Sequence, residues 1–244
     1  KKEMALTVDI YGDSFSCPCC KTDEKDTYLD ILSDQFLLDN TSKHGVGAQW
    51  CVEKFMARQS HGDFLLFCLP DAQRLWLQYL PDYMASQSNK IYAMMKANNM
   101  DFPEELEELA VEEAPKIFKD YEGYYNTGMH RIFEVLASSF ILSKAKHYKK
   151  VLIWPSSGSG FPFRNYNHAL EIPSNVLMVP KSLTFISQFE INNKTNQPHF
   201  DFDTRSNHLS HANHIVLAKQ ISQFFLTNKH PDIMEFKRYI YGMQ

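Results

Sequence analysis

The chain has 244 residues, of which 44% are hydrophobic and 22% are charged, and its formal net charge is −4. The length fits one large α/β domain or two small ones, with enough chain to bury a substantial core. The charge gives no electrostatic basis for binding nucleic acid or an anionic membrane, and no apolar run approaches the length of a membrane span. We therefore expect neither as a partner.

Strands and helices are predicted to alternate along the chain. Apolar runs predict strands at residues 5–11, 64–69, 151–155 and 175–180. Apolar residues at helical spacing predict helices at residues 27–38, 50–56, 128–147 and 212–225. Residues 79–127 are less regular and are expected to form a helical insertion within a single domain of residues 1–244.

Each predicted helix has an apolar face that is expected to lie against the sheet. These faces comprise Tyr28, Ile31, Leu32 and Phe36; Trp50, Val52, Phe55 and Met56; Ile132, Phe133, Leu136, Phe140 and Ile141; and Ile215, Val216, Leu217, Ile221 and Phe224. Strands that alternate with such helices predict a doubly wound, mainly parallel α/β sheet. In such sheets sites form where the strands end, and Ser14, Asp71 and Ser156 all follow predicted strands.

The five cysteines are Cys17, Cys19, Cys20, Cys51 and Cys68. An odd, clustered set argues against a secreted disulfide framework and favours a reducing, cytoplasmic compartment, or a virion component assembled there. The cluster at residues 17–20 has no second Cys or His pair at zinc-finger spacing, so we expect no metal site. The serine- and glycine-rich residues 156–160 lack the lysine and spacing of a phosphate-binding loop, and we expect no cofactor.

The segment Gly12-Asp13-Ser14-Phe15-Ser16 follows the first predicted strand. Glycine permits a tight bend there, and a serine at the end of a core strand is held on rigid backbone. The amides at the start of a following helix are free to stabilise negative charge. Ser14 is therefore a candidate nucleophile.

Three histidines, His208, His211 and His214, lie where the chain enters the last predicted helix. A serine nucleophile needs a base to accept its proton, and imidazole has the appropriate intrinsic pKa. A histidine fixed just before this helix, at the same edge of the sheet as Ser14, would serve as that base.

The two ends of the chain together resemble the SGNH, or GDSL-type, hydrolases. The resemblance rests on Gly12-Asp13-Ser14-Phe15-Ser16 and on His208-Leu209-Ser210 followed by Asn213-His214. It implies a flavodoxin-like, three-layer αβα fold and the activity of an esterase or acyl hydrolase. The order of elements is similar over nearly the whole chain, and the divergent motifs resemble those of members encoded by bacteriophages and other viruses.

Carried over to this sequence, the resemblance implies a role for four residues. Ser14 matches the nucleophile, whose own amide contributes to the oxyanion hole, and His208 matches the base. Gly47 or Ala48 matches the second backbone donor to the oxyanion.

The third family motif differs here. Cys68-Leu69-Pro70-Asp71 stands where the family has Gly-x-Asn-Asp, so the asparagine side chain that completes the oxyanion hole is missing. Loss of one such donor typically costs about 10²–10³ in rate. Gln73, Arg74 or an asparagine from another loop could replace it. The residues assigned to substrate binding are Asp71, Arg74 and His211.

The triad acid is also displaced. The family places an aspartate three residues before its histidine, where this chain has Arg205. Asp203 is the candidate acid, because a looped backbone could bring its carboxylate to the imidazole of His208. A dyad without an acid, or a backbone carbonyl in that role, is the alternative, and His211 and His214 are the alternative bases.

These residues predict a serine hydrolase that forms an acyl-enzyme. Small acyl groups, for instance O-acetyl on a carbohydrate, are the substrates that the resemblance suggests. A sugar-stacking surface could be formed by Trp154, Phe161, Phe163 and Tyr166. The alternative is a non-catalytic binding or structural, virion-type protein that keeps the hydrolase fold, which the missing asparagine and displaced aspartate favour. The sequence does not indicate an oligomeric state.

Overall fold

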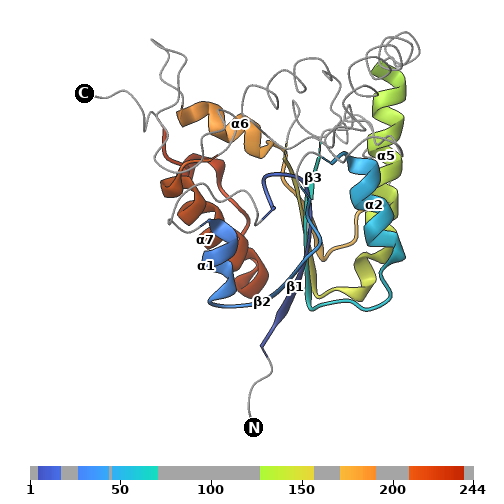
Figure 1. Cartoon of the computed structure of the whole chain (residues 1–244), viewed down its shortest axis with the longest axis horizontal. Coiled ribbons are helices and arrows are strands. Elements are labelled where there is room, and N and C mark those ends of the chain that lie inside the picture. Colours follow the sequence, from blue (N-terminus) through green and yellow to red (C-terminus); the bar gives the residue numbers. More distant parts are fainter. Residues whose placement is uncertain are drawn as a thin grey trace, which may run out of the picture.

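A computed structural model describes residues 5–17, 27–43, 46–70, 127–156, 171–190 and 209–238. Its centre is a sheet of five parallel strands (Figure 1). The strands are β1 (Thr7–Tyr11), β2 (Leu37–Asn40), β3 (Phe64–Leu69), β4 (Lys150–Pro155) and β5 (Val176–Met178). Their order, β2-β1-β3-β4-β5, is that of a flavodoxin-like doubly wound sheet, so the predicted fold class is confirmed.

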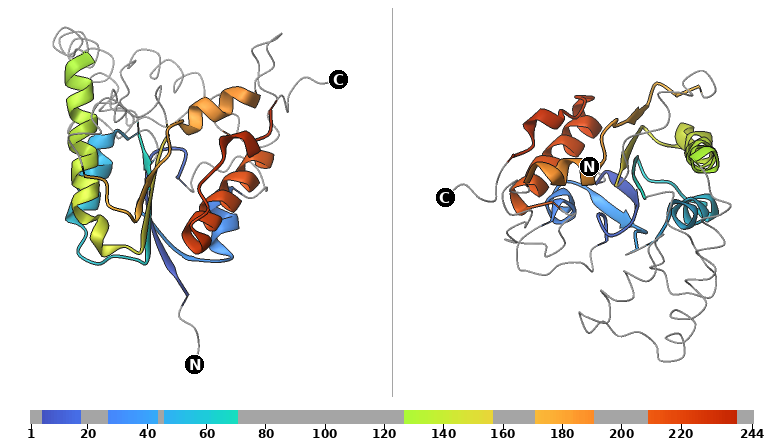
Figure 2. Two further views of the ribbon diagram at one scale, coloured as in Figure 1. Left: turned by 180° about the vertical axis from the view of Figure 1, so that it is seen from behind. Right: turned by 90° about the horizontal axis from the view of Figure 1, so that it is seen from above.

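The described helices cover both faces of this sheet (Figures 1 and 2). One layer contains α1 (Tyr28–Ser33), α6 (Leu183–Ser187) and α7 (His211–Thr227), and the other contains α2 (Ala48–Ala57) and α5 (Thr127–Lys144). Short 3-10 turns follow at η2 (Ala145–His147), η4 (Gln188–Glu190) and η5 (Ile233–Glu235). Among the described residues, no helix is both long and apolar enough to cross a membrane.

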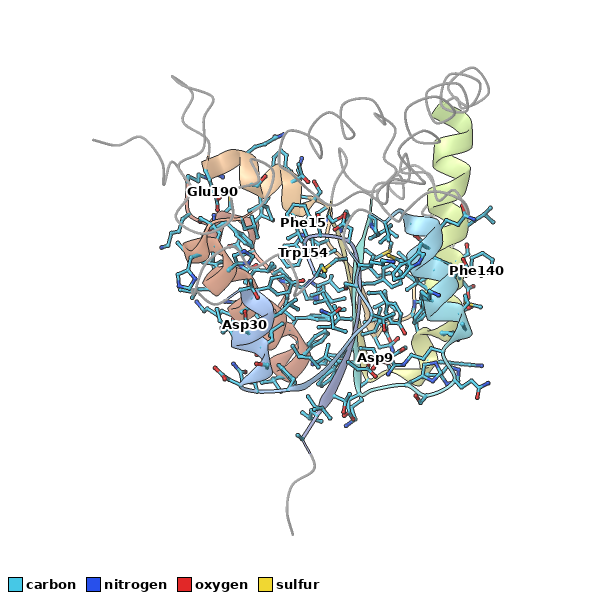
Figure 3. The ribbon with its side chains drawn as sticks, in the orientation of Figure 1. Asp9, Phe15, Asp30, Phe140, Trp154 and Glu190 are labelled. Carbon is cyan, nitrogen blue, oxygen red and sulfur yellow. The ribbon has the colours of Figure 1, made fainter. Side chains whose placement is uncertain are left out.

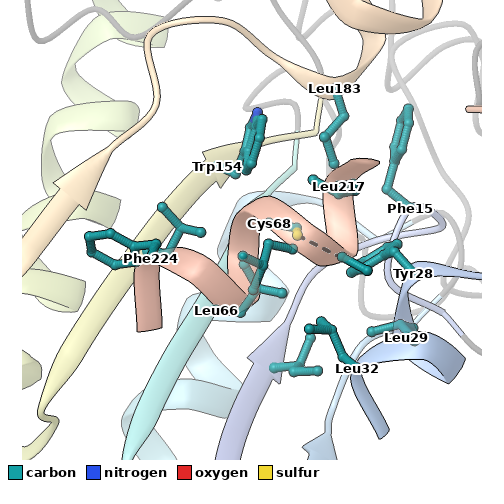
Figure 4. Packing of buried hydrophobic residues seen from close by; sticks show 14 of the residues in the cluster. Phe15, Tyr28, Leu29, Leu32, Leu66, Cys68, Trp154, Leu183, Leu217 and Phe224 are labelled. Atoms are coloured by element: carbon teal, nitrogen blue, oxygen red, sulfur yellow. Dashed lines mark hydrogen bonds between the residues drawn. The ribbon is translucent and has the colours of Figure 1, made fainter. Parts of the chain in front are cut away.

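Successive side chains of the central strands point to opposite faces of the sheet, so the core has two halves. All six residues of β3 are buried, as its unbroken apolar sequence predicts for a strand covered on both faces. Leu66 and its neighbours Ile10 and Leu152 face the α1 and α7 layer, where Figure 4 shows Leu66 beneath α7. Leu65 and Phe67 face the opposite layer.

Two lysines bind the carboxyl ends of helices. The Nζ atom of Lys150, the first residue of β4, donates to the carbonyls of Phe224 and Phe225 at 3.0 and 2.8 Å. The carboxyl end of α7 therefore lies where the strands begin, and its amino end lies at the edge where the strands end. Lys144 of α5 likewise donates to carbonyls at the end of α2.

The helix predicted at residues 27–38 is wrong in its second half. The helix α1 ends at Ser33, and after a turn Leu37–Asn40 forms the edge strand β2, whose Leu37 pairs with Thr7 of β1. Tyr28, Leu32 and Phe36 are buried, so apolar spacing continued across the turn and imitated a longer helix. Backbone pairing with β1 decides the conformation, because it gives the amides and carbonyls of Leu37–Asn40 partners in the neighbouring strand.

Four residues expected in the core are instead exposed: Met56, Leu136, Phe140 and Ile215, each with 39–48% of its surface accessible. Each lies on a helix whose neighbouring apolar residues, such as Phe55, Ile141 and Leu217, are buried. The buried stripe of these helices is therefore narrower than their apolar stripe. Ile132 and Phe133 lie on the part of α5 whose side chains fall outside the description.

We predict that Lys150→Met lowers the free energy of unfolding by about 1 kcal/mol, because it removes two hydrogen bonds to the last turn of α7 while keeping the apolar stem. Urea denaturation followed by circular dichroism measures this loss. Lys149→Met is the matched control, since its ion pair with Asp63 is exposed and contributes little. Equal stability of the Lys150→Met protein and wild type would contradict the assignment of this lysine as a helix cap.

Candidate active site

The candidate site lies at the point where the strand order reverses direction. From β1 the chain passes to β2 on one side, and then returns to β3 on the other. Outside the carboxyl ends of the strands, such a reversal leaves a crevice in which ligands bind in doubly wound sheets. Ser14 stands three residues after Tyr11, the last residue of β1, and Pro70 directly follows β3.

Ser14 sits in a tight turn fixed by the aspartate before it. The amide of Ser16 donates to the carbonyl of Asp13 at 2.9 Å, and the amide of Phe15 donates to its carboxylate at 3.1 Å. Asp13 is fully buried and Ser14 is 6% exposed. Aspartate favours this geometry because its short carboxylate accepts from the backbone two residues ahead.

The carboxylate of Asp13 also joins the turn to β4. The hydroxyl of Ser156, the residue after β4, donates to Asp13 Oδ2 at 2.9 Å. Ser156 is itself fully buried, and its amide donates to the carbonyl of Leu69 at the end of β3. Its carbonyl accepts from the amide and hydroxyl of Thr184 in α6. Asp13 and Ser156 thus connect the ends of β1, β3 and β4 to the start of α6.

Glycine is required at position 12 by the close approach of β3. A Cβ atom there would lie 2.8 Å from Ser16 Oγ, 2.9 Å from Cys68 Cβ and 3.1 Å from the Cys68 carbonyl oxygen. Two of these three atoms belong to or adjoin backbone and cannot rotate away. The glycine therefore sets how closely the Ser14 turn lies against β3.

Tyr28 joins the Ser14 turn to α7. Its hydroxyl donates to Ser16 Oγ at 2.8 Å and lies 3.7 Å from Cys68 Sγ, the contact drawn in Figure 4. Its amide donates to His214 Nδ1 at 3.3 Å, and its ring stacks on the imidazole. His214 is buried in this interface, so it acts there as a packing and hydrogen-bonding residue.

The thiol next to the turn is not a competing nucleophile. Burial raises the pKa of Cys68 to about 11, so the sulfur stays protonated near neutral pH, and the thiolate is the reactive form. Burial likewise holds the pKa of Tyr28 well above its usual value. Cys51 is also a buried free thiol, whereas Cys17 is disulfide-bonded.

Asn40 fixes the other side of the turn. Its side-chain amide donates to the carbonyl of Ser16 at 2.7 Å, and the amide of Lys43 donates to the carbonyl of Gly12 at 3.1 Å. Asn40 is thus an asparagine close to the candidate nucleophile that supports the turn. The described contacts do not show an asparagine in the oxyanion-binding role that the family motif assigns to one.

Gly47 and Ala48 stand at the amino end of α2. Gly47 is the N-cap residue in an extended conformation with no side-chain cap, and Ala48 is the first helical residue. Amides in the first turn of a helix have no partner within the helix, and the helix dipole favours negative charge there. Because α2 runs antiparallel to the strands between β2 and β3, these amides lie at the edge of the sheet that carries Ser14.

A buried carboxylate holds the amino end of α7. Glu190 of η4, labelled in Figure 3, is 2% exposed and accepts from the Ser210 amide at 2.9 Å and the Ser210 hydroxyl at 2.8 Å. It also accepts from the side-chain amide of Asn213. Burial raises the pKa of Glu190 to about 7, although these donors oppose the shift.

The remaining predicted site residues are distributed as follows. His211 is the first residue of α7 and is partly exposed. The candidate base His208, the candidate acid Asp203 and the proposed substrate contacts Asp71 and Arg74 lie outside the described residues, as does the insertion expected before α5. Within the described ranges, no group of three or more His, Cys, Asp or Glu side chains could hold a metal ion.

Trp154 does not belong to a sugar-stacking surface. It is 1% exposed, its indole N–H donates to the carbonyl of Lys181, and its ring packs edge-on against Phe236. The prediction was wrong here because Trp154 lies on β4 and points into the α7 half of the core. Phe161, Phe163 and Tyr166 lie outside the described residues.

Two organising residues, Ser156 and Glu190, were not predicted for their observed roles. The sequence did place Ser156 after a strand, which is a usable signal for a residue at the site edge. Glu190 has no such signal, since its partner Ser210 is 20 residues away and the contact exists only in the folded chain.

No family model, no curated protein and no solved structure matches the chain.

We predict that Gly12→Ala lowers the free energy of unfolding by about 1–3 kcal/mol, because the added methyl overpacks the contact with β3. Adding Ser16→Ala is expected to restore part of the loss, since it removes the nearest of the three crowded atoms. Denaturant titration of the wild type, both single variants and the double variant measures this coupling. A Gly12→Ala protein as stable as wild type would refute the close packing of the turn.

We predict a pH-dependent contribution from Glu190. Because its pKa is raised on folding, the folded protein binds more protons than the unfolded chain between about pH 4.5 and pH 7. This contribution is full at low pH and is lost as the pH rises through 7. The stability advantage of wild type over Glu190→Gln should therefore fall by about 2–3 kcal/mol between pH 5 and pH 8.

Chemical denaturation at several pH values checks this difference. Glu235→Gln is the matched control, because lysines lower the pKa of that exposed carboxylate and it stays ionised throughout the window. A constant difference between wild type and Glu190→Gln would mean that Glu190 does not titrate in this range.

Proposed function

We propose that this chain is a serine hydrolase that cleaves an ester through an acyl-enzyme, with Ser14 as nucleophile and His208 as base. The observation that carries the proposal is the position of Ser14, in a turn held by Asp13 and Ser156 where the strand order reverses. A nucleophile needs a fixed direction of attack, and contacts with the ends of three strands hold the turn that carries Ser14.

The proposed reaction has two steps. Ser14 Oγ attacks the carbonyl carbon while His208 accepts the hydroxyl proton, and the tetrahedral oxyanion accepts hydrogen bonds from the amides of Ser14 and of Gly47 or Ala48. Collapse of the intermediate breaks the ester bond, passes the proton to the departing alcohol and leaves the acyl group on Ser14. Water then attacks that acyl group by the same route and releases the acid.

Asp203 is proposed to orient the imidazole of His208, and Asp71, Arg74 and His211 to contact the substrate. The suggested substrate class is a small acyl ester, such as O-acetyl on a carbohydrate. This class rests on the resemblance to SGNH hydrolases.

A non-catalytic binding or structural protein, possessing the hydrolase fold without its activity, is the second candidate. The specific observation in its favour is Asn40, whose amide supports the carbonyl of Ser16 instead of supplying the oxyanion donor missing after β3. A fold alone does not establish activity.

We predict that a fluorophosphonate probe labels the wild-type protein and that Ser14→Ala abolishes both labelling and hydrolysis of p-nitrophenyl acetate. Ser33→Ala, which removes an exposed hydroxyl of α1, is the control and should be labelled like wild type. Mass spectrometry of the labelled peptide locates the adduct. Labelling that persists in Ser14→Ala would remove Ser14 as nucleophile, and an unlabelled, inactive wild type would favour the non-catalytic candidate.

The same assay identifies the base. Removing a general base typically lowers the rate about 10²–10⁴-fold, so His208→Ala should be labelled that much more slowly. His211→Ala should retain most of the labelling rate, because its proposed contact is with the substrate and not with the proton of Ser14. The opposite result would transfer the role to His211. Gly62→Ala, which crowds Asp9 and the Thr7 carbonyl of β1, tests whether lost stability alone slows the reaction.

A further inference from the structure

We propose that Glu190 is a positioning residue that fixes the segment carrying the catalytic base, acting through Ser210 and Asn213 at the amino end of α7. The inference rests on the proposed function and adds to it a residue outside the family's three-residue triad. Glu190 does not contact the substrate in this proposal; it holds Ser210, the residue next to which the base lies in the chain.

The contacts of Glu190 hold both the backbone and the side chains of this helix end. Its two carboxylate oxygens lie 3.0 and 2.9 Å from the Ser210 amide, and Oε1 also accepts from the Ser210 hydroxyl. Asn213 donates its side-chain amide to the same oxygen and accepts from the amide of Lys237 at 2.7 Å. Glu190, Ser210 and Asn213 are each less than 5% exposed, so water cannot readily replace any of these partners.

The arrangement resembles a capping box whose acid comes from elsewhere in the chain. In α1 the box is local: Thr27 caps the helix and Asp30, three residues on, binds the amide and hydroxyl of Thr27. In α7 the cap is Ser210, but the residue three positions on is the neutral Asn213. Glu190 of η4 supplies the carboxylate, and it thereby ties α7 to the segment that follows α6.

The contact between Glu190 and Ser210 affects the base because both candidate bases are within two residues of Ser210 in the chain. Consecutive Cα atoms are about 3.8 Å apart, so any residue two positions from Ser210 has its Cα within about 7.6 Å of it. His208 is two positions before Ser210 and His211 is one position after it. A carboxylate that fixes Ser210 therefore restricts either candidate base, whichever of them reacts.

The experiment compares Glu190→Ala and Glu190→Gln with Lys150→Met in p-nitrophenyl acetate hydrolysis. Glutamine keeps one oxygen to accept from Ser210 and Asn213, whereas alanine keeps none. Lys150→Met loosens the opposite end of the same helix and is the control for destabilisation alone. Hydrogen exchange of a peptide covering residues 209–214 is measured for each protein.

We expect Glu190→Ala to lower kcat by about 10- to 100-fold with KM unchanged, because a misplaced base slows the chemical step without altering substrate binding. Glu190→Gln should show a smaller loss of kcat, and Lys150→Met less than a twofold change. Hydrogen exchange at residues 209–214 should be faster in Glu190→Gln than in wild type, and fastest in Glu190→Ala.

A loss of kcat in Glu190→Ala no greater than in Lys150→Met would overturn the inference. If the alanine variant does not fold, Glu190→Gln takes its place. A loss of kcat in Glu190→Gln no greater than in Lys150→Met would then overturn the inference. An inactive, unlabelled wild type would overturn the proposed function and the catalytic part of this inference together. In that case unchanged exchange in Glu190→Gln would also refute the anchoring of α7.

Discussion

The hydrogen bond from the Ser156 hydroxyl to the Asp13 carboxylate is the contact on which the candidate site depends. It joins the turn after β1 to the residue after β4, across β3, so three strands hold one short segment. Both residues are fully buried, and loss of this donor would cost the carboxylate one of its hydrogen bonds at a place where water cannot readily replace it. The turn that carries Ser14 is therefore attached to the sheet at several points.

Buried carboxylates hold the frame at three places. In the middle of β1, Asp9 forms an ion pair with Arg58 at 2.9 Å and accepts from the Tyr148 hydroxyl at 3.0 Å. Figure 3 shows Asp9 and Phe15 near opposite ends of the sheet. Asp13 and Glu190 also accept from amides and hydroxyls. All three carboxylates thus orient backbone, and Asp9 adds an ion pair to its hydrogen bonds.

The sequence predicted best what depends on local pattern. The strands β1, β3 and β4 followed from apolar runs, and the turn at Ser14 followed from its position after β1. The edge strand β2 was missed because Phe36 continues the apolar spacing of α1, so the predicted helix ran on to residue 38, whereas pairing with β1 makes Leu37–Asn40 a strand. The contacts of Ser156 and Glu190 were beyond prediction, since their partners are 143 and 20 residues away and meet only after folding.

The two ends of the chain are related to each other through Tyr28. Its hydroxyl binds Ser16 in the turn after β1, and its amide and ring bind His214 in the first turns of α7. The position of Tyr28 is in turn set by Thr27, the N-cap immediately before it, and by Asp30, which completes the capping box of α1. The turn after β1 and the first turn of α7 are far apart in the sequence, and Tyr28 is hydrogen-bonded to both. The groups that make these contacts are buried and therefore shielded from competition with water.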